Sequence, residues 1–455
     1  MGNLVGYAHL INAMKLKAIG LKKPALVQPV IRIERLNDAL AVPKAVAPEA
    51  RDFLAHIIFA LKHEGVNLAI LAQALPRIED RILVQAITQS PSSGYLRKVC
   101  FLWEAFSDHL LDYTHKPKGP GVLLFDPERY ITGPSERNNR WRVDFNGLGT
   151  LQYCATVERT PEIQALLEYD ILGRSKEFIA SLPKDMMDRA INCAYQSETD
   201  SSFAIEKEAL SQQKAERFVQ LLRQAHDRRP LTEDYLVSLQ NNAISQPQES
   251  AVAFRHEQNH LTSSFRGAAG VTYIPPPPDL CGDLMTELMA FANRAPLELD
   301  PLVAAGIASF GFVFLHPFMD GNGRLSRFLI HQALCCSGAL ENGVLLPVSV
   351  AMQREEQRYL EALQSFSKPA RQFWDVRRID DDNMSFNFTG DPSLYRYWDA
   401  TECVAFTMEM AQRALEVELR GETEYLQKYD RLHKVVNDNY DGKRPGITPC
   451  PNTLV

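Results

Sequence analysis

The sequence predicts a mostly α-helical protein built from more than one domain. Residues 162–373 follow a helical pattern almost throughout, and within them residues 301–315 form an apolar run of helical length. At 455 residues the chain is too long for one compact domain. We therefore expect a helical core around 301–315, buried on most faces and flanked by smaller pieces at both ends.

The first 120 residues are predicted to form a helical region. Residues 53–62 are amphipathic and end before Gly65, and further helices are expected at 68–75 and 95–106. Short helices with adjacent basic residues leave two interpretations open, a helix-turn-helix-like nucleic-acid adapter or a small bundle that packs on the core. We favour the bundle, because basic residues are sparse here.

A linker and a small β-structure are expected at residues 121–160. The Pro117-Lys-Gly-Pro-Gly121 stretch is the strongest linker signal of the chain. Residues 140–154 alternate in polarity around a turn, which predicts a β-hairpin.

The main domain is expected at residues 161–375, followed by a C-terminal region at 376–455. The composition of 376–393 predicts a polar connection, and the aromatic and apolar residues of 394–436 predict helices. Residues 264–278 carry a glycine turn between strand-forming residues and end in four prolines, which predicts a short β-hairpin and a rigid polyproline stretch.

Residues 316–327 carry most of the chemical information in this chain. They are His-Pro-Phe-Met-Asp-Gly-Asn-Gly-Arg-Leu-Ser-Arg. Gly321 and Gly323 allow backbone conformations that are closed to other residues, so the amides around Asn322 can form an anion nest. The positive end of the following helix would close that nest. The segment therefore predicts a phosphate site in a loop between two helices.

The other polar residues of this segment suit a polyphosphate with a metal ion. Asp320 offers a hard oxygen to Mg²⁺, which prefers one or two carboxylates together with substrate phosphates. Arg324 and Arg327 lie three residues apart on one helical face, so both guanidinium groups can bind phosphate oxygens. His316 is placed to take a proton from an attacking hydroxyl. A single histidine before proline is most often an ordinary loop residue. Six suitable residues in one short run favour a site.

The run matches the signature His-Pro-Phe-x-Asp/Glu-Gly-Asn-Gly-Arg-x-x-Arg, so the chain resembles the Fic-domain adenylyltransferases. The resemblance implies the Fic fold, a helical core with a β-hairpin flap. It also implies an enzyme that transfers AMP from ATP to a Ser, Thr or Tyr hydroxyl of a target protein, or of itself, and releases pyrophosphate. In that reaction His316 is the base and Asp320 binds Mg²⁺. Arg324 and Arg327 then neutralise the β- and γ-phosphates.

The hairpin expected at 264–278 is similar to the Fic flap, which lies over the active site and holds the target by strand addition. The target is therefore expected along residues 265–278. An ordinary surface hairpin is the alternative that the residues leave open.

A second resemblance concerns control of the reaction. Ser202 and Glu206 lie four residues apart in the segment 201–208, so on a helix they share a face. Their spacing resembles the Ser/Thr-x-x-x-Glu-Gly/Asn inhibitory helix of Fic proteins. It implies that Glu206 pairs with Arg327 and leaves the nucleotide in a non-productive pose. Lys207 departs from the family pattern, which has a small residue there. A capped amphipathic helix with solvated carboxylates is the alternative.

The adenine base needs an apolar slot. Residues 354–363 resemble the helix that closes the adenine side in this family, with Tyr359 and Leu363 on one face. We expect Tyr359 to contact the base, and a place in the core is the alternative.

Other functions stay open at this point. Within the same fold they are transfer of UMP, phosphocholine or phosphate, and the reverse reaction, in which Glu206 positions a water that removes AMP. The complete Gly-Asn-Gly-Arg-x-x-Arg run argues against the phosphate-transferring branch. A non-catalytic module that binds nucleotide or a partner belongs to a different class, and the intact His316 and Asp320 argue against it.

Composition limits which classes of binding partner and which cellular location we expect. A net charge of −7 gives no electrostatic footprint for nucleic acid over the whole chain, so only the N-terminal region leaves that partner open. No apolar run reaches the length of a membrane span. Eight cysteines show neither paired spacing nor a metal pattern, which favours a reduced, cytoplasmic location.

Overall fold

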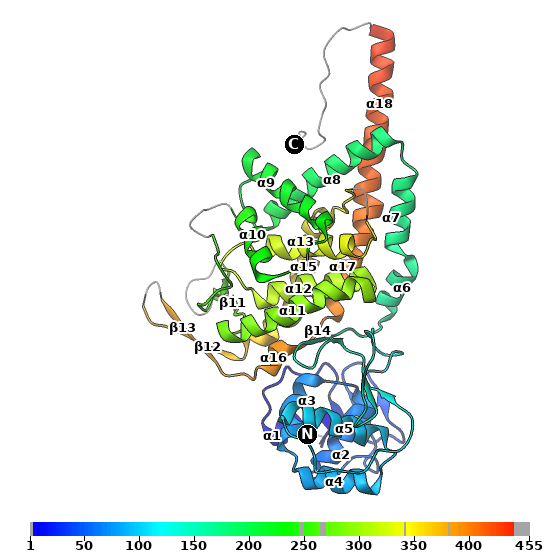
Figure 1. Ribbon diagram of the computed structural model, residues 1–455, viewed down its shortest axis with the longest axis vertical. Coiled ribbons are helices and arrows are strands. Elements are labelled where there is room, and N and C mark those ends of the chain that lie inside the picture. The colour runs from blue at the N-terminus through cyan, green and yellow to red at the C-terminus, as the bar shows by residue number, and fades with distance from the viewer. Residues whose placement is uncertain (1–2, 245–249, 264–269, 341–342, 381–382, 441–455) are drawn as a thin grey trace. The chain divides into compact units, whose positions relative to one another are not determined.

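The computed structural model describes residues 3–244, 250–263, 270–340, 343–380 and 383–440, and it is mostly helical (Figure 1). The predicted fold class is therefore confirmed. The chain forms two compact units, each assembled from several segments. The first unit comprises residues 1–159, 258–280 and 366–399, and the second comprises 160–257, 281–365 and 400–455.

The first unit contains a helical bundle near its N-terminus, where helices were predicted. Side chains of Asp52, Asn67 and Ser93 cap three of these helices by accepting a backbone N–H three residues on. Their apolar faces enclose a core that includes Leu71, Leu102 and the buried Trp141. The helices of this unit are α1 (Gly6–Met14), α2 (Phe53–Phe59), α3 (Leu68–Ala74), α4 (Asp80–Gln89), α5 (Gly94–Ser107) and α16 (Ser393–Arg396), with short turns at Ala60–Glu64 and Leu75–Arg77.

Every strand that the structure describes lies in the first unit. They form three small sheets, ordered β1-β2-β4-β3, β5-β7-β6 and β14-β9-β8, and two isolated hairpins, β10-β11 and β12-β13. The strands are β1 (Leu4–Val5), β2 (Ala25–Val27), β3 (Glu34–Arg35), β4 (Leu40–Val42), β5 (Val122–Leu123), β6 (Glu136–Asn138), β7 (Val143–Phe145), β8 (Leu148–Gly149), β9 (Cys154–Thr156), β10 (Leu261–Thr262), β11 (Val271–Tyr273), β12 (Trp374–Arg378), β13 (Met384–Phe388) and β14 (Tyr397–Asp399).

Two strand predictions need correction. The single hairpin predicted at 140–154 is two hairpins, because the pairing of β6 with β7 ends at Phe145 and β8 starts a new pairing with β9. The polar connection predicted at 376–393 is wrong, since β12 and β13 pair there over five residues. Apolar residues alternate along this hairpin and pack on Val271 and Ile274, which stabilises strands in a segment that is polar by composition.

The hairpin predicted at 264–278 is present with shifted strands. Leu261 of β10 pairs with Tyr273 of β11, so the first strand lies before residue 264. The predicted glycine turn at 264–269 lies outside the described residues. The expected domain limits at 120, 160 and 375 remain predictions, since the compact units combine segments that are distant in sequence.

The described residues of the second unit form helices and connecting loops without strands, and the unit is built around α12 (Pro301–Leu315). This helix is apolar on all sides and packs on α13 (Asn322–Cys336) and α17 (Thr401–Arg413), as its composition requires. Figure 1 shows α12 and α13 in the middle of this helical group. The remaining helices are α6 (Pro161–Tyr169), α7 (Ile171–Ala180), α8 (Lys184–Ile205), α9 (Gln212–Arg223), α10 (Glu233–Ala243), α11 (Pro278–Glu298), α14 (Val348–Arg354), α15 (Glu356–Arg371) and α18 (Arg420–Tyr440), with turns at Gln224–Asp227 and Ala414–Leu419. In the described parts of the chain, no helix has both the length and the apolar character needed to cross a membrane.

Candidate active site

The predicted helix–loop–helix is present at residues 301–336. α12 ends at His316, whose φ of 50° lies in the left-handed region, so the helix cannot continue past it. The loop returns to α13 through Gly321, with φ 86°, which is a conformation that glycine adopts without cost. The loop therefore presents its side chains between the end of one buried helix and the start of another.

Gly323 is needed for a different reason from the predicted one. It lies within α13, and a Cβ built on it would come 2.0 Å from a carboxylate oxygen of Glu206. A glycine at this position thus allows the carboxylate to approach the helix, whereas only Gly321 requires the special backbone conformation.

His316 is held in one proton form. Its Nδ1 lies 3.1 Å from the carbonyl oxygen of Val313, and because a carbonyl only accepts, Nδ1 carries the hydrogen and Nε2 the lone pair. Burial lowers the pKa of His316 to about 4, the Val313 bond opposes that shift, and the positive charge of Arg255 adds to it. At neutral pH the imidazole is therefore unprotonated, as a general base must be.

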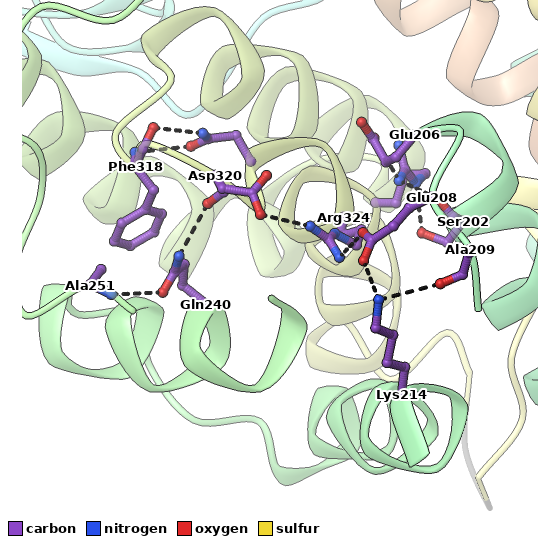
Figure 2. Close-up of polar contacts among 12 residues, drawn as sticks. Ser202, Glu206, Glu208, Ala209, Lys214, Gln240, Ala251, Phe318, Asp320 and Arg324 are labelled. Atoms are coloured by element: carbon purple, nitrogen blue, oxygen red, sulfur yellow. Dashed lines mark hydrogen bonds and ion pairs between the residues drawn. The ribbon is translucent and has the colours of Figure 1, made fainter. Parts of the chain in front are cut away.

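The loop between His316 and Gly321 is closed by Asn322. The Asn322 amide donates to the carbonyl of Phe318 at 2.8 Å and accepts from the Phe318 N–H at 3.0 Å. Gln240 adds a bond from its amide to the carbonyl of Asp320 at 3.2 Å (Figure 2). The Asn322 side chain thus shapes the loop, and the anion nest expected at the amides around it stays a prediction.

Arg324 takes part in a chain of charged groups. It donates to Glu208 at 2.7 Å and to Asp320 at 3.0 Å, and Glu208 also accepts from Lys214 at 2.8 Å (Figure 2). Sequence reasoning missed Glu208, because a carboxylate far from the motif in sequence gives no sign of its partner. Asp320 keeps 40% of its side chain exposed, so this carboxylate is accessible to a metal ion.

Arg327 forms the predicted pair with the segment 201–208. Its Nη2 donates to the Glu206 carboxylate and to the Ser202 carbonyl, each at 2.9 Å, and its Nε donates to the Ser202 hydroxyl at 2.9 Å. The arginine is buried, with 2% of its side chain exposed. The sequence spacing of Ser202 and Glu206 thus brings both side chains to one arginine.

The backbone at the end of α8 explains why the family pattern has a small residue where Lys207 stands. The N–H of Lys207 donates to the carbonyl of Ala204, and the N–H of Glu208 donates to the carbonyl of Phe203. These two hydrogen bonds define a Schellman motif. In that motif Lys207 occupies the left-handed position, with φ 56°. Glycine and asparagine are favoured there for backbone reasons, so Lys207 adds local strain without preventing Glu206 from reaching Arg327.

Tyr359 lies in an aromatic cluster. Its ring stacks on Phe406 with centroids 5.7 Å apart and meets the edge of Phe310 at 6.1 Å. Burial raises the pKa of Tyr359, and the nearby Arg327 opposes that shift. The side chain therefore lies next to the arginine and packs on core helices, so its predicted contact with adenine stays a prediction.

One nitrogen in each of the two arginines, Arg324 and Arg327, has no hydrogen-bond partner among the described residues. Nε of Arg324 and Nη1 of Arg327 are buried and make no hydrogen bond within the described part of the chain. A buried donor that stays unsatisfied costs about 1–3 kcal/mol, so both atoms mark a place where an acceptor oxygen would stabilise the fold.

Comparisons with known proteins find similarity to Fic proteins. Residues 230–334 match the model of the Fic/DOC family. "Protein adenylyltransferase fic-1" of Caenorhabditis elegans is 34% identical over 77 residues, which cover 17% of this chain and 15% of the relative. "Protein adenylyltransferase Fic" of Drosophila mojavensis is 35% identical over 91 residues, covering 19% of this chain and 16% of the relative. The chain thus spans about one sixth of the length of these curated relatives.

Solved structures of Fic proteins are also similar. A Fic family protein from Desulfovibrio desulfuricans aligns with a TM-score of 0.40 and 19% identity, over 58% of this chain and 75% of that one. Residues 134–508 of fic-1 from C. elegans align with a TM-score of 0.37 and 14% identity, over 81% of this chain and 98% of that one. The family match at 230–334 includes α10, α12 and the whole loop that carries His316 and Asp320. Residues 230–334 of this chain are therefore similar to the Fic/DOC family.

Proposed function

We propose that this protein transfers AMP from ATP to a hydroxyl side chain of a protein. One observation carries the proposal: a histidine whose Nδ1 carries the hydrogen and whose Nε2 carries the lone pair shares a loop–helix segment with two buried arginines, each of which has one nitrogen without an acceptor in the described part of the chain. A proton acceptor next to an anion site is what attack of a hydroxyl on a phosphate requires.

The residues have separate tasks in this proposal. Nε2 of His316 takes the proton of the acceptor hydroxyl, whose oxygen then bonds to the α-phosphorus. The bond from that phosphorus to the bridging oxygen breaks, and pyrophosphate leaves with the bond pair. Arg324 and Arg327 bind the β- and γ-phosphates and balance the charge on the departing group.

The residues present fit one Mg²⁺ ion. The described residues contain no group of three or more His, Cys, Asp or Glu side chains suited to a metal. The accessible carboxylate of Asp320 suits an ion that takes its other ligands from phosphates and water. When bound, Mg²⁺ would supply positive charge to the phosphates.

We further propose that the segment 202–208 keeps the phosphate site closed. Arg327 is paired with Glu206, and Arg324 is paired with Glu208 and Asp320. Phosphate oxygens carry the same charge as these carboxylates and need the same donors, so the two cannot occupy them together. Opening of this segment would then precede productive binding of ATP.

The acceptor is proposed to lie along the hairpin β10-β11, where a two-stranded sheet leaves an edge for a further strand. Removal of AMP is a second candidate, since Glu206 lies near enough to His316 for its charge to raise the pKa of that histidine. A carboxylate next to the imidazole is suited to orient a water.

A labelling experiment separates these candidates. The full chain and its Glu206→Gln variant are incubated with a cell extract and ATP, UTP or CDP-choline, each labelled on the phosphate that would be transferred. We expect protein bands labelled from ATP alone, more strongly with Glu206→Gln, and none with His316→Ala. Labelling from another donor, or loss of AMP from prelabelled protein in place of labelling, would replace the proposed reaction.

A further inference from the structure

We propose that Arg255 is a positioning residue that fixes both the main chain and the proton form of His316. The proposal rests on the proposed function, in which that histidine is the base. Arg255 lies 61 residues before His316 and outside the signature, so the motif itself does not point to it.

Arg255 binds three consecutive carbonyls at the end of α12. Its Nε donates to the carbonyl of His316 at 2.9 Å, its Nη2 to that of Leu315 at 3.4 Å, and its own backbone N–H to that of Pro317 at 2.8 Å. A further bond from Nη1 to the carbonyl of Glu257 at 3.0 Å orients the guanidinium plane. The arginine is 6% exposed, so these contacts are shielded from water.

These carbonyls need an external donor. The last carbonyls of a helix have no intrahelical partner, and here the chain turns left-handed at His316 and meets Pro317, which has no N–H to offer. The same end of α12 carries the negative pole of the helix, which favours a cation. A buried arginine supplies both the donors and the charge.

A guanidinium group suits this place better than an ammonium group. Its donors lie in one plane and point in fixed directions, so one side chain can reach carbonyls of successive residues. The hydrogen bonds from Arg255 fix the left-handed backbone conformation at His316. This conformation places Nδ1 of His316 opposite the carbonyl of Val313. The direction of the Nε2 lone pair therefore depends on Arg255.

The charge of Arg255 acts on the same ring. The charged groups that influence His316 are Arg255, which lowers its pKa, and Glu206 and Asp320, which raise it. Cys281 also lies at this helix end and donates to the Leu315 carbonyl at 3.2 Å. Burial raises the pKa of Cys281 to about 11, so this thiol is neutral and adds no charge. Arg255 is thus the cation that offsets two carboxylates near the base.

Two substitutions separate the geometric from the electrostatic part. Arg255→Gln keeps amide donors and removes the charge, and Arg255→Lys keeps the charge and removes the planar set of donors. Arg294→Gln, which changes an exposed arginine of α11, is the matched control. The His316 ring is followed by NMR titration in the full chain, with its signal assigned by its loss in His316→Gln.

We expect the pKa of His316 to rise in Arg255→Gln and to stay near its native value in Arg255→Lys. Both variants should lower kcat for AMP transfer by about 10–100-fold, with KM for ATP changed less than about twofold, because misplacing the base by a fraction of an ångström is enough. In Arg255→Gln the acidic limb of the pH profile of kcat should also move to higher pH.

The titration decides the proposal independently of the reaction. If the proposed function fails, so that no AMP transfer is found, the His316 titration still tests whether Arg255 controls the ring. An unchanged His316 pKa in Arg255→Gln overturns the proposal. So does a loss of thermal stability with unchanged kcat in Arg255→Lys, since that is the result expected of a purely structural arginine.

Discussion

The pair between Glu206 and Arg327 should limit access of ATP to the site. In Glu206→Gln the side chain keeps its size and loses its charge, so the Schellman motif at the end of α8 is undisturbed. Arg327 loses its ionic partner at 2.9 Å and keeps the two bonds to Ser202. The guanidinium group should therefore become available to the γ-phosphate.

The size of the effect follows from the burial of the two partners. A hydrogen bond to a charged group contributes about 1.5–3 kcal/mol when buried, and an exposed ion pair about 0–1 kcal/mol. Arg327 is 2% exposed and Glu206 is 37% exposed, so the contact lies between these limits. A value of about 1 kcal/mol corresponds to roughly a fivefold larger population of the open form.

The same reasoning predicts a smaller effect for Glu208→Gln. Glu208 is shared between Arg324 and Lys214, and Arg324 keeps Asp320 as a second partner. Because the two glutamates pair with different arginines, the double variant should exceed either single one.

Calorimetry measures the Kd for ATP, and incorporation of labelled AMP into the protein itself measures the rate. We expect Glu206→Gln to lower the Kd about fivefold and to raise labelling by a similar factor, whereas Glu216→Gln, an exposed glutamate of α9, should do neither. Equal affinity and labelling in wild type and Glu206→Gln would refute the inhibitory role and leave the assignment of His316 standing.

Four further outcomes are expected. His316→Ala should lose about 10²–10⁴-fold of the transfer rate while its Kd for ATP stays unchanged, and a normal rate would remove the histidine as base. Asp320→Ala should need a higher Mg²⁺ concentration for half-maximal transfer, and an unchanged Mg²⁺ titration would show that the phosphates hold the ion alone. Lys207→Gly should raise the free energy of unfolding by about 1 kcal/mol in denaturant titrations, because glycine adopts the left-handed position without strain, and it should not raise labelling. Burial raises the pKa of Glu64 from 4.5 to about 7, so the native state binds this proton more tightly and stability falls as pH rises between these values. The free energy of unfolding should therefore fall by roughly 3 kcal/mol over this pH range in the native chain and not in Glu64→Gln. Denaturant titrations that show the same pH dependence in both proteins would contradict this prediction.

The sequence alone was sufficient for the features that depend on neighbours in the chain. The apolar run at 301–315 specifies a buried helix because its composition leaves no polar face. The segment 316–327 specifies its own loop because Gly321 permits a left-handed turn and Asn322 can bond back to Phe318. Ser202 and Glu206 lie on one face because four residues make about one helical turn.

The tertiary structure decided every feature that joins distant segments. The hairpin of β12 and β13 was missed because its alternating apolar residues stabilise strands only when they pack on Val271 and Ile274, which lie elsewhere in the sequence. Arg255 and Glu208 were missed because a lone arginine or glutamate in a polar stretch has no local pattern, and each acquires a partner only when the chain folds back on α12 or α13. Local periodicity and backbone conformation are determined by residues that are adjacent in sequence. The partner of a charged side chain depends instead on which segments the hydrophobic core brings together.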